Sequence, residues 1–99
     1  MTGTPNQVEW ATRIRRLVNE EFDRVARSFR AVAAKQNDVR RHGTEAILAI
    51  LEDQRAAVMS RHEAGYFIKY WQEIGDQVRQ LIFHDPRYQE IKSDRAARP

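Results

Sequence analysis

The segment that decides the predicted fold is Arg41-His42-Gly43-Thr44-Glu45. Basic side chains are favourable at the negative end of a helix, and glycine is favoured in the left-handed position just beyond that end. Thr44 is a suitable N-cap for a following helix, and Glu45 is favourable in its first turn. Because so short a link brings two helices back alongside each other, the segment predicts an antiparallel helical hairpin.

Upstream of this turn, the apolar residues follow a heptad spacing. They recur at Val18, Phe22, Val25, Phe29, Val32 and Val39. Asn6 and Glu9 have the spacing of a capping box, and neither proline nor glycine interrupts residues 6–42. The pattern therefore predicts one long helix over about 6–42, preceded by a disordered N-terminus at residues 1–5.

Downstream of the turn, two apolar seams follow each other out of phase by one residue. The first runs through Ile47, Leu51 and Val58, the second through Phe67, Trp71, Ile74, Val78 and Leu81. Gly65 lies at the mismatch. We expect one helix over about 44–84 that bends near Gly65, and the alternative is a three-helix bundle broken there. The hairpin domain thus covers residues 6–84, and in its register Phe29 faces Ala56 and Ala57.

Residues 85–99 are predicted to form a short capped helix followed by a frayed basic tail. Asp85 is a suitable N-cap, and Pro86 fits the first helical position, where a missing N–H costs nothing.

The segment Ala46-Ile47-Leu48-Ala49-Ile50-Leu51 is apolar on every side of a helix. A helix that is hydrophobic all round must be buried on all sides, and two helices alone cannot provide that cover. We therefore expect the hairpin to dimerise with a second copy of itself into a four-helix bundle. The interface candidates are Ile47, Leu48, Ile50, Leu51, Phe67, Trp71, Ile82 and Phe83.

The basic residues suggest nucleic acid as an alternative partner. The 99 residues carry 17 Lys and Arg against 14 Asp and Glu, a net charge of +3. The candidate contacts lie on the first helix and at the hairpin tip: Arg13, Arg16, Arg24, Arg27, Arg40 and Arg41. Acidic residues such as Glu20 and Asp23 alternate with these arginines, so the surface presents little net field to phosphates. We therefore expect nucleic-acid binding to be the less favoured function.

Several function classes lack their residues in this sequence. The absence of cysteine excludes disulfides, thiolate zinc sites and a cysteine nucleophile. The three histidines lie far apart in the predicted hairpin, so we expect no metal, no cofactor and no catalytic residues. No stretch approaches the roughly 18 apolar residues of a membrane span, and no signal peptide is evident, which favours a cytoplasmic protein.

The function predicted from these patterns is that of a small, non-enzymatic helical assembly or protein-interaction module, which forms homodimers and presents a surface to an unidentified protein partner. One further feature is a concentration of aromatic residues in the second half of the chain, with Trp10 opposite: Tyr66, Phe67, Tyr70, Trp71 and Phe83. We interpret this group as core or dimer interface, and a ligand pocket is the alternative.

Overall fold

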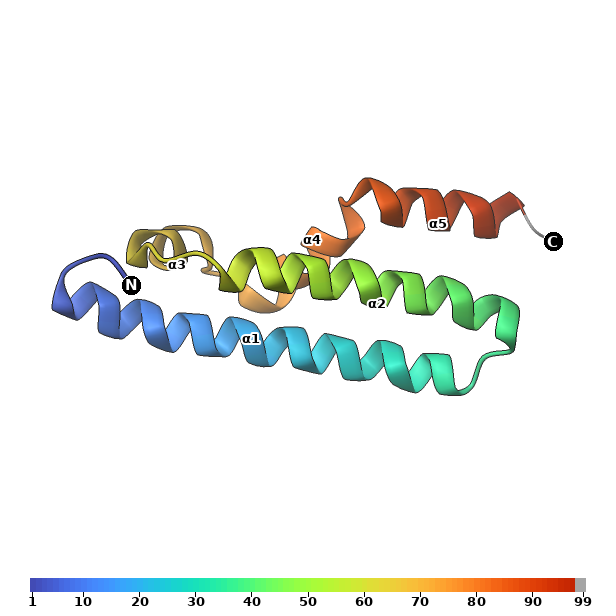
Figure 1. Ribbon diagram of the computed structural model, residues 1–99, viewed down its shortest axis with the longest axis horizontal. Coiled ribbons are helices and arrows are strands. Elements are labelled where there is room, and N and C mark those ends of the chain that lie inside the picture. Colours follow the sequence, from blue (N-terminus) through green and yellow to red (C-terminus); the bar gives the residue numbers. More distant parts are fainter. Residues whose placement is uncertain (98–99) are drawn as a thin grey trace.

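The computed structural model describes residues 1–97 as an all-helical chain, which confirms the all-α class. Helices α1 (Pro5–Ala34) and α2 (Asp38–Met59) form an antiparallel hairpin. Three shorter helices, α3 (Ala64–Tyr70), α4 (Ile74–Phe83) and α5 (Pro86–Ala97), then run back along it (Figure 1). The molecule is elongated, measuring 54 × 23 × 19 Å along its principal axes.

The hairpin turn lies at residues 35–37 and not at Gly43, so the prediction of one helix over 6–42 is wrong. Asn37 is the N-cap of α2, and its side chain accepts a hydrogen bond from the backbone N–H of Arg40 at 3.0 Å. Gly43, expected to terminate the first helix, instead lies inside α2.

Arg41 explains why basic residues gather near this turn. Its guanidinium donates to the carbonyl oxygens of Ala33 at 3.1 Å and Gln36 at 2.8 Å. The last carbonyls of a helix have no partner within the helix, so a side chain that reaches back to them stabilises its end. The basic residue does act on the end of the first helix, but from within the second.

The second helix ends at Met59, so the prediction of a continuous helix over 44–84 is wrong, and the predicted alternative of a break near Gly65 is closer. Residues 60–63 reverse the chain. Gly65 follows inside α3 and does not have a positive φ. The bend therefore depends on the loop before Gly65 and not on the glycine itself.

The N-terminal residues, predicted to be disordered, lie against this loop. The Thr2 N–H donates to the His62 carbonyl at 2.7 Å, and the Thr2 carbonyl accepts from Ala64 N–H at 2.8 Å. The capping box of α1 belongs to Thr4 and Gln7, with Pro5 at the first position, so the assignment of the N-cap to Asn6 is wrong. Helix α1 begins one residue earlier than predicted.

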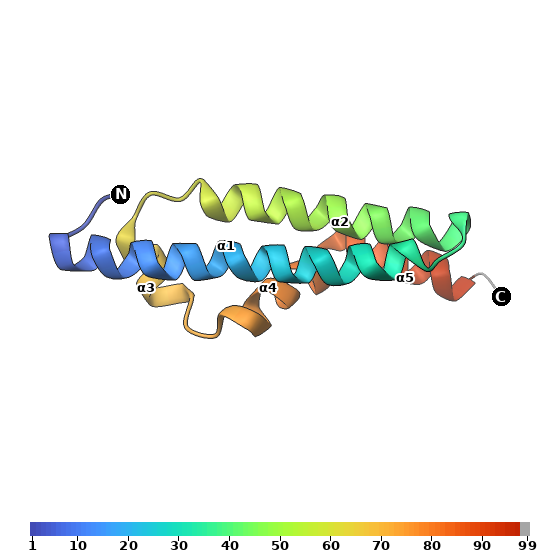
Figure 2. The same ribbon diagram turned by 90° about the horizontal axis from the view of Figure 1, so that it is seen from below.

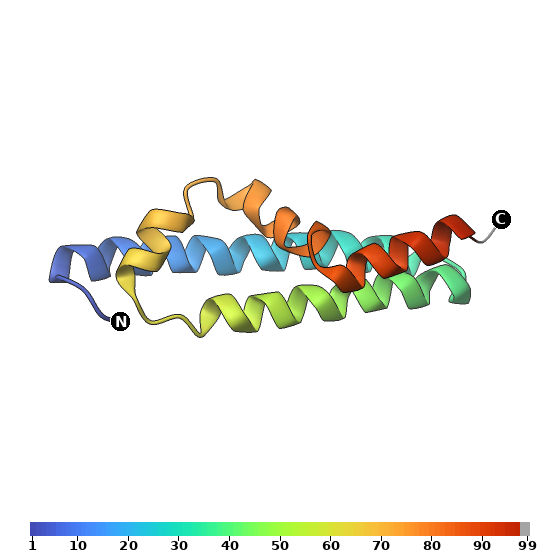
Figure 3. The same cartoon turned by 90° about the horizontal axis from the view of Figure 1, so that it is seen from above.

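Helices α4 and α5 cover the hairpin, as Figure 3 shows: α4 lies beside α1, and α5 lies beside α2. The predicted start of the last helix is confirmed, because the Asp85 carboxylate accepts the Arg87 N–H at 2.9 Å. Helix α5 extends through Ala97, over most of the segment expected to be a frayed tail.

The apolar segment 46–51 is covered within the single chain. Ile47, Ile50 and Leu51 are at most 3% exposed, since α2 packs against α1, α4 and α5. Six of the eight predicted interface residues are buried in the chain's own core: Ile47, Ile50, Leu51, Phe67, Trp71 and Ile82. Leu48 is half-buried and Phe83 is exposed. The apolarity of α2 therefore does not require a second chain.

Candidate functional site

Helix α1 carries a line of exposed apolar side chains. Trp10 is 56%, Leu17 46% and Val32 49% exposed. At about 100° per residue, these three side chains lie within about 60° of one another around the helix axis. Figure 2 looks onto α1, which runs in front of the other helices along its whole length. We refer to Trp10, Leu17 and Val32 as the α1 stripe.

A cleft of about 170 Å³ opens at the Val32 end of the α1 stripe, between α1 and α4. Its lining is mostly apolar and consists of Val25, Ser28, Phe29, Val32, Arg79, Ile82 and Phe83. Phe83 is 37% exposed at the rim. No ion pair involves Arg79 within residues 1–97. We refer to this feature as the α1–α4 cleft.

The interface candidates predicted from the sequence include Ile82 and Phe83 of the cleft, and Trp10 was predicted to lie with the aromatic group in the core or a dimer interface. Leu17 and Val32 were not assigned to an interface, because the prediction followed one apolar seam in the first helix. That seam, through Val18, Phe22 and Val25, faces the core. A second spacing of four and three residues links Trp10, Ile14 and Leu17 beside it. Two adjacent seams on one helix indicate that it is covered on two sides, and this signal was present in the sequence.

Charged residues on α1 separate Leu17 from the α1–α4 cleft. The Arg24 guanidinium donates through Nε to the Glu21 carboxylate at 2.7 Å, and this hydrogen bond raises the pKa of Arg24. Glu20, one position away, is exposed. The surface of α1 thus has apolar ends and a charged middle.

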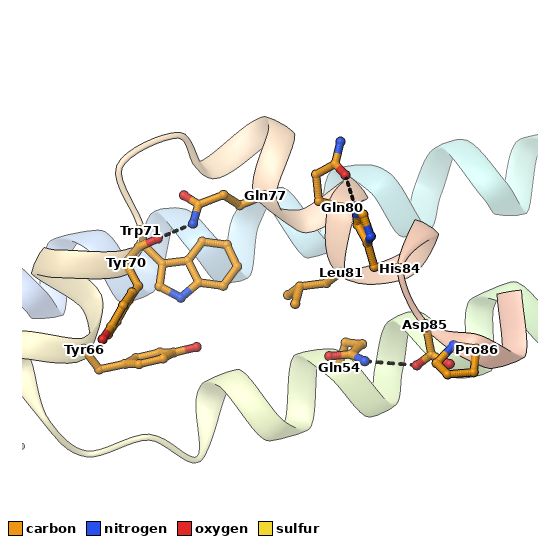
Figure 4. A pocket seen from close by; sticks show the side chains of 10 residues that line it. All are labelled: Gln54, Tyr66, Tyr70, Trp71, Gln77, Gln80, Leu81, His84, Asp85 and Pro86. Atoms are coloured by element: carbon orange, nitrogen blue, oxygen red, sulfur yellow. Dashed lines mark hydrogen bonds between the residues drawn. The ribbon is translucent and has the colours of Figure 1, made fainter. Parts of the chain in front are cut away.

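A larger groove of about 530 Å³ lies on the other side of α4, between α2, α3 and the start of α5 (Figure 4). Tyr66, Tyr70 and Trp71 line one end, so part of the aromatic group predicted from sequence is gathered here. The Tyr66 and Tyr70 rings are 5.9 Å apart. The guanidinium of Arg61 lies over Tyr66, 4.0 Å from the ring centroid. Phe67, in contrast, is buried in the core.

The other end of the groove is polar, and its acidic residue, Asp85, has a structural role as the N-cap of α5. Three hydrogen bonds from Arg87, two from its guanidinium and one from its backbone N–H, hold the pKa of Asp85 well below its usual range. Gln54 adds a fourth hydrogen bond at 3.0 Å, and the Arg87 guanidinium also pairs with Asp53 at 2.6 Å. Asp85 is therefore an ionised helix cap and not a candidate proton donor at neutral pH.

Four of the six arginines proposed for nucleic-acid binding, Arg13, Arg16, Arg24 and Arg27, lie within about 80° of one another around α1, and Arg40 and Arg41 lie near the start of α2. Arg13 pairs with Glu9 at 2.6 Å, Arg24 with Glu21, and Arg41 with Asp38 at 3.5 Å. Arg16, Arg27 and Arg40 take part in no ion pair within the described part of the chain. Three of the six arginines therefore have an acidic neighbour, which lowers the net positive charge around them, but exposed ion pairs of this kind are weak.

Within residues 1–97, no group of three or more His, Asp or Glu side chains is placed to hold a metal ion. None of the helices in this range combines the length and apolarity needed to cross a lipid bilayer. No family model, no curated protein and no solved structure is significantly similar to the chain. The case for a function thus depends on the exposed surfaces described above.

Proposed function

We propose that the protein is a small, non-enzymatic protein-interaction module that assembles as a homodimer. The observation that carries the proposal is the exposed α1 stripe, which continues into the apolar α1–α4 cleft. The proposal retains the homodimer expected from the sequence but moves its interface from α2 to α1.

The arrangement of exposed side chains supports an interface on α1. Single exposed apolar residues are normal on a protein surface, but aligned ones indicate a binding surface. Trp10, Leu17, Val32 and Phe83 are four of the seven large apolar residues that remain exposed, and all four lie on α1 or at the cleft beside it. Tryptophan is also enriched among the residues that contribute most to protein–protein affinity.

Sedimentation velocity tests the proposal directly. At protein concentrations from about 1 to about 100 µM, which correspond to moderate affinities, we expect the 11.7 kDa chain to sediment at twice its mass. Leu17→Glu replaces an apolar residue of the α1 stripe by a charged one, and burying that charge in an interface would be costly. We expect this variant to be monomeric and to keep its helical circular dichroism.

Val39→Glu is the matched control. Val39 is 62% exposed and lies in the first turn of α2, not on α1, so its substitution introduces the same charge on a helix outside the proposed interface. A wild-type monomer at the highest concentration would contradict the proposal. An equal effect of the two substitutions on dimerisation would contradict the assignment to α1.

A further inference from the structure

We propose that the two copies pack their α1 helices antiparallel, so that Trp10 of each copy fills the α1–α4 cleft of the other. This arrangement rests on the homodimer proposed above and specifies its geometry. The indole is the largest exposed apolar side chain, and the cleft is an unfilled apolar hollow on the same face of the same helix. The cleft is then complete only when a second copy supplies Trp10.

The spacing of Trp10 and the cleft along α1 fixes where the two-fold axis of such a dimer lies. Trp10 and Val32 are equidistant from Glu21 along α1, about 16 Å on either side at 1.5 Å per residue. A two-fold axis near Glu21 therefore places Trp10 of one copy beside Val32 of the other, and the reverse contact forms at the same time. An isologous interface requires this self-complementarity, and a closed dimer leaves no free copy of either surface.

The lining of the cleft suits an indole chemically. Val25, Phe29 and Phe83 provide apolar and aromatic contacts. Ser28 donates its hydroxyl hydrogen to the Arg24 carbonyl at 3.3 Å, which leaves its lone pairs free to accept the indole N–H. Arg79 borders the cleft, where its guanidinium can lie over the ring, a cation–π arrangement.

The same register brings each Arg24 of the charged middle near acidic groups of the other copy. Antiparallel packing around Glu21 brings Glu20 of one copy within about one helical turn of Arg24 of the other. Each copy also contributes its own Glu21–Arg24 pair. Glu20 and Glu21 of both copies then lie near the axis, and the two Arg24 side chains flank this acidic group on either side.

Cross-linking of single-cysteine variants tests the direction and register of the helices, because the natural chain has no cysteine. Arg13 and Ala31 are both exposed and lie on the same edge of the stripe. We expect a short bis-maleimide to join Arg13→Cys chains to Ala31→Cys chains in a mixture. Neither variant alone should cross-link efficiently, because like positions are more than roughly 20 Å apart in the antiparallel dimer.

A second experiment tests the insertion of Trp10. Trp10→Ala should weaken the dimer at least about tenfold, as expected when a buried tryptophan is removed from an interface. Ser28→Phe should block the cleft and weaken the dimer similarly. Because both changes remove the same contact, the double variant should be little weaker than either single variant. Tyr70→Ala, in the groove on the other side of α4, is the control and should leave the dissociation constant unchanged.

The outcomes separate this inference from the homodimer itself. A wild-type chain that sediments as a monomer contradicts both proposals. A stable dimer in which Arg13→Cys and Ala31→Cys each cross-link to themselves contradicts the antiparallel arrangement only. A stable dimer with additive effects of Trp10→Ala and Ser28→Phe contradicts the insertion of Trp10 into the cleft.

Discussion

Replacing Phe22 and Phe29 separately by alanine gives the sharpest test of the fold. Phe22 has no exposed surface, its ring lies 6.4 Å from that of Trp71, and Arg55 covers its face at 5.8 Å. Removing a fully buried phenylalanine costs about 3–5 kcal/mol, because the lost burial and the resulting cavity add. Phe29 is only half-buried and borders the α1–α4 cleft. Half the usual burial of such a side chain corresponds to about 1–2 kcal/mol.

The two variants should therefore differ by roughly 2–3 kcal/mol in the free energy of unfolding. For a chain of this length, that corresponds to about 10–20 °C in Tm. Urea denaturation followed by circular dichroism measures the difference, and the Leu17→Glu background keeps dimerisation from contributing. The hairpin register predicted from the sequence, with Phe29 facing two alanines, gives Phe29 the large loss instead. Equal losses, or a greater loss at Phe29, would refute the packing described here.

Three further changes test local features of the structure. Gly65→Ala should stabilise the protein by about 0.4–1 kcal/mol in urea denaturation, because an added Cβ meets nothing within 4 Å and the unfolded chain loses freedom. Gly43→Ala should stabilise the protein less than Gly65→Ala or should destabilise it, because the new Cβ would lie 2.7 Å from the Arg95 guanidinium. An equal gain in stability at both glycines would contradict this contact. Asp85→Asn should lower the free energy of unfolding at pH 7 and should make that free energy less dependent on pH under acidic conditions. The Arg87 hydrogen bonds lower the folded-state pKa of Asp85, so its contribution is present above its unfolded pKa of about 3.9 and is lost as the pH falls below that value. An unchanged pH profile would count against the Asp85 network.

The sequence was informative about the class of fold but not about its turns. Asn37 and Asp38 are an adequate start signal for α2, since Asn37 is the N-cap and Asp38 supplies an acidic first turn. Their signal was outweighed by the absence of proline and glycine and by the apparent heptad step from Val32 to Val39. Both valines are at least 49% exposed, so that step does not mark a buried seam. A spacing pattern cannot distinguish a core position from a surface position when only its regularity is considered.

The phase mismatch near Gly65 was a more reliable signal than the glycine itself. A change of phase means that the two halves cannot share one straight buried face, so the chain must bend or break between them. Here it breaks at residues 60–63, and the Thr2 backbone satisfies polar groups of the loop. No local pattern reveals that long-range contact. The position of the turn was therefore predictable to within a few residues, but its stabilising partner was not.

The apolar segment of α2 shows how one correct inference led to interface candidates that are mostly buried within the chain. Burial on all sides was the right expectation for Ile47, Ile50 and Leu51. The missing cover comes from α4, which was predicted to continue the long second helix, and from α5, which was predicted to be a short capped helix with a frayed tail. Once the second helix ends at Met59, the remaining residues return over the hairpin and supply that cover. The unsatisfied apolar surface then lies on α1, at Trp10, Leu17 and Val32, and that surface carries the case for a second copy.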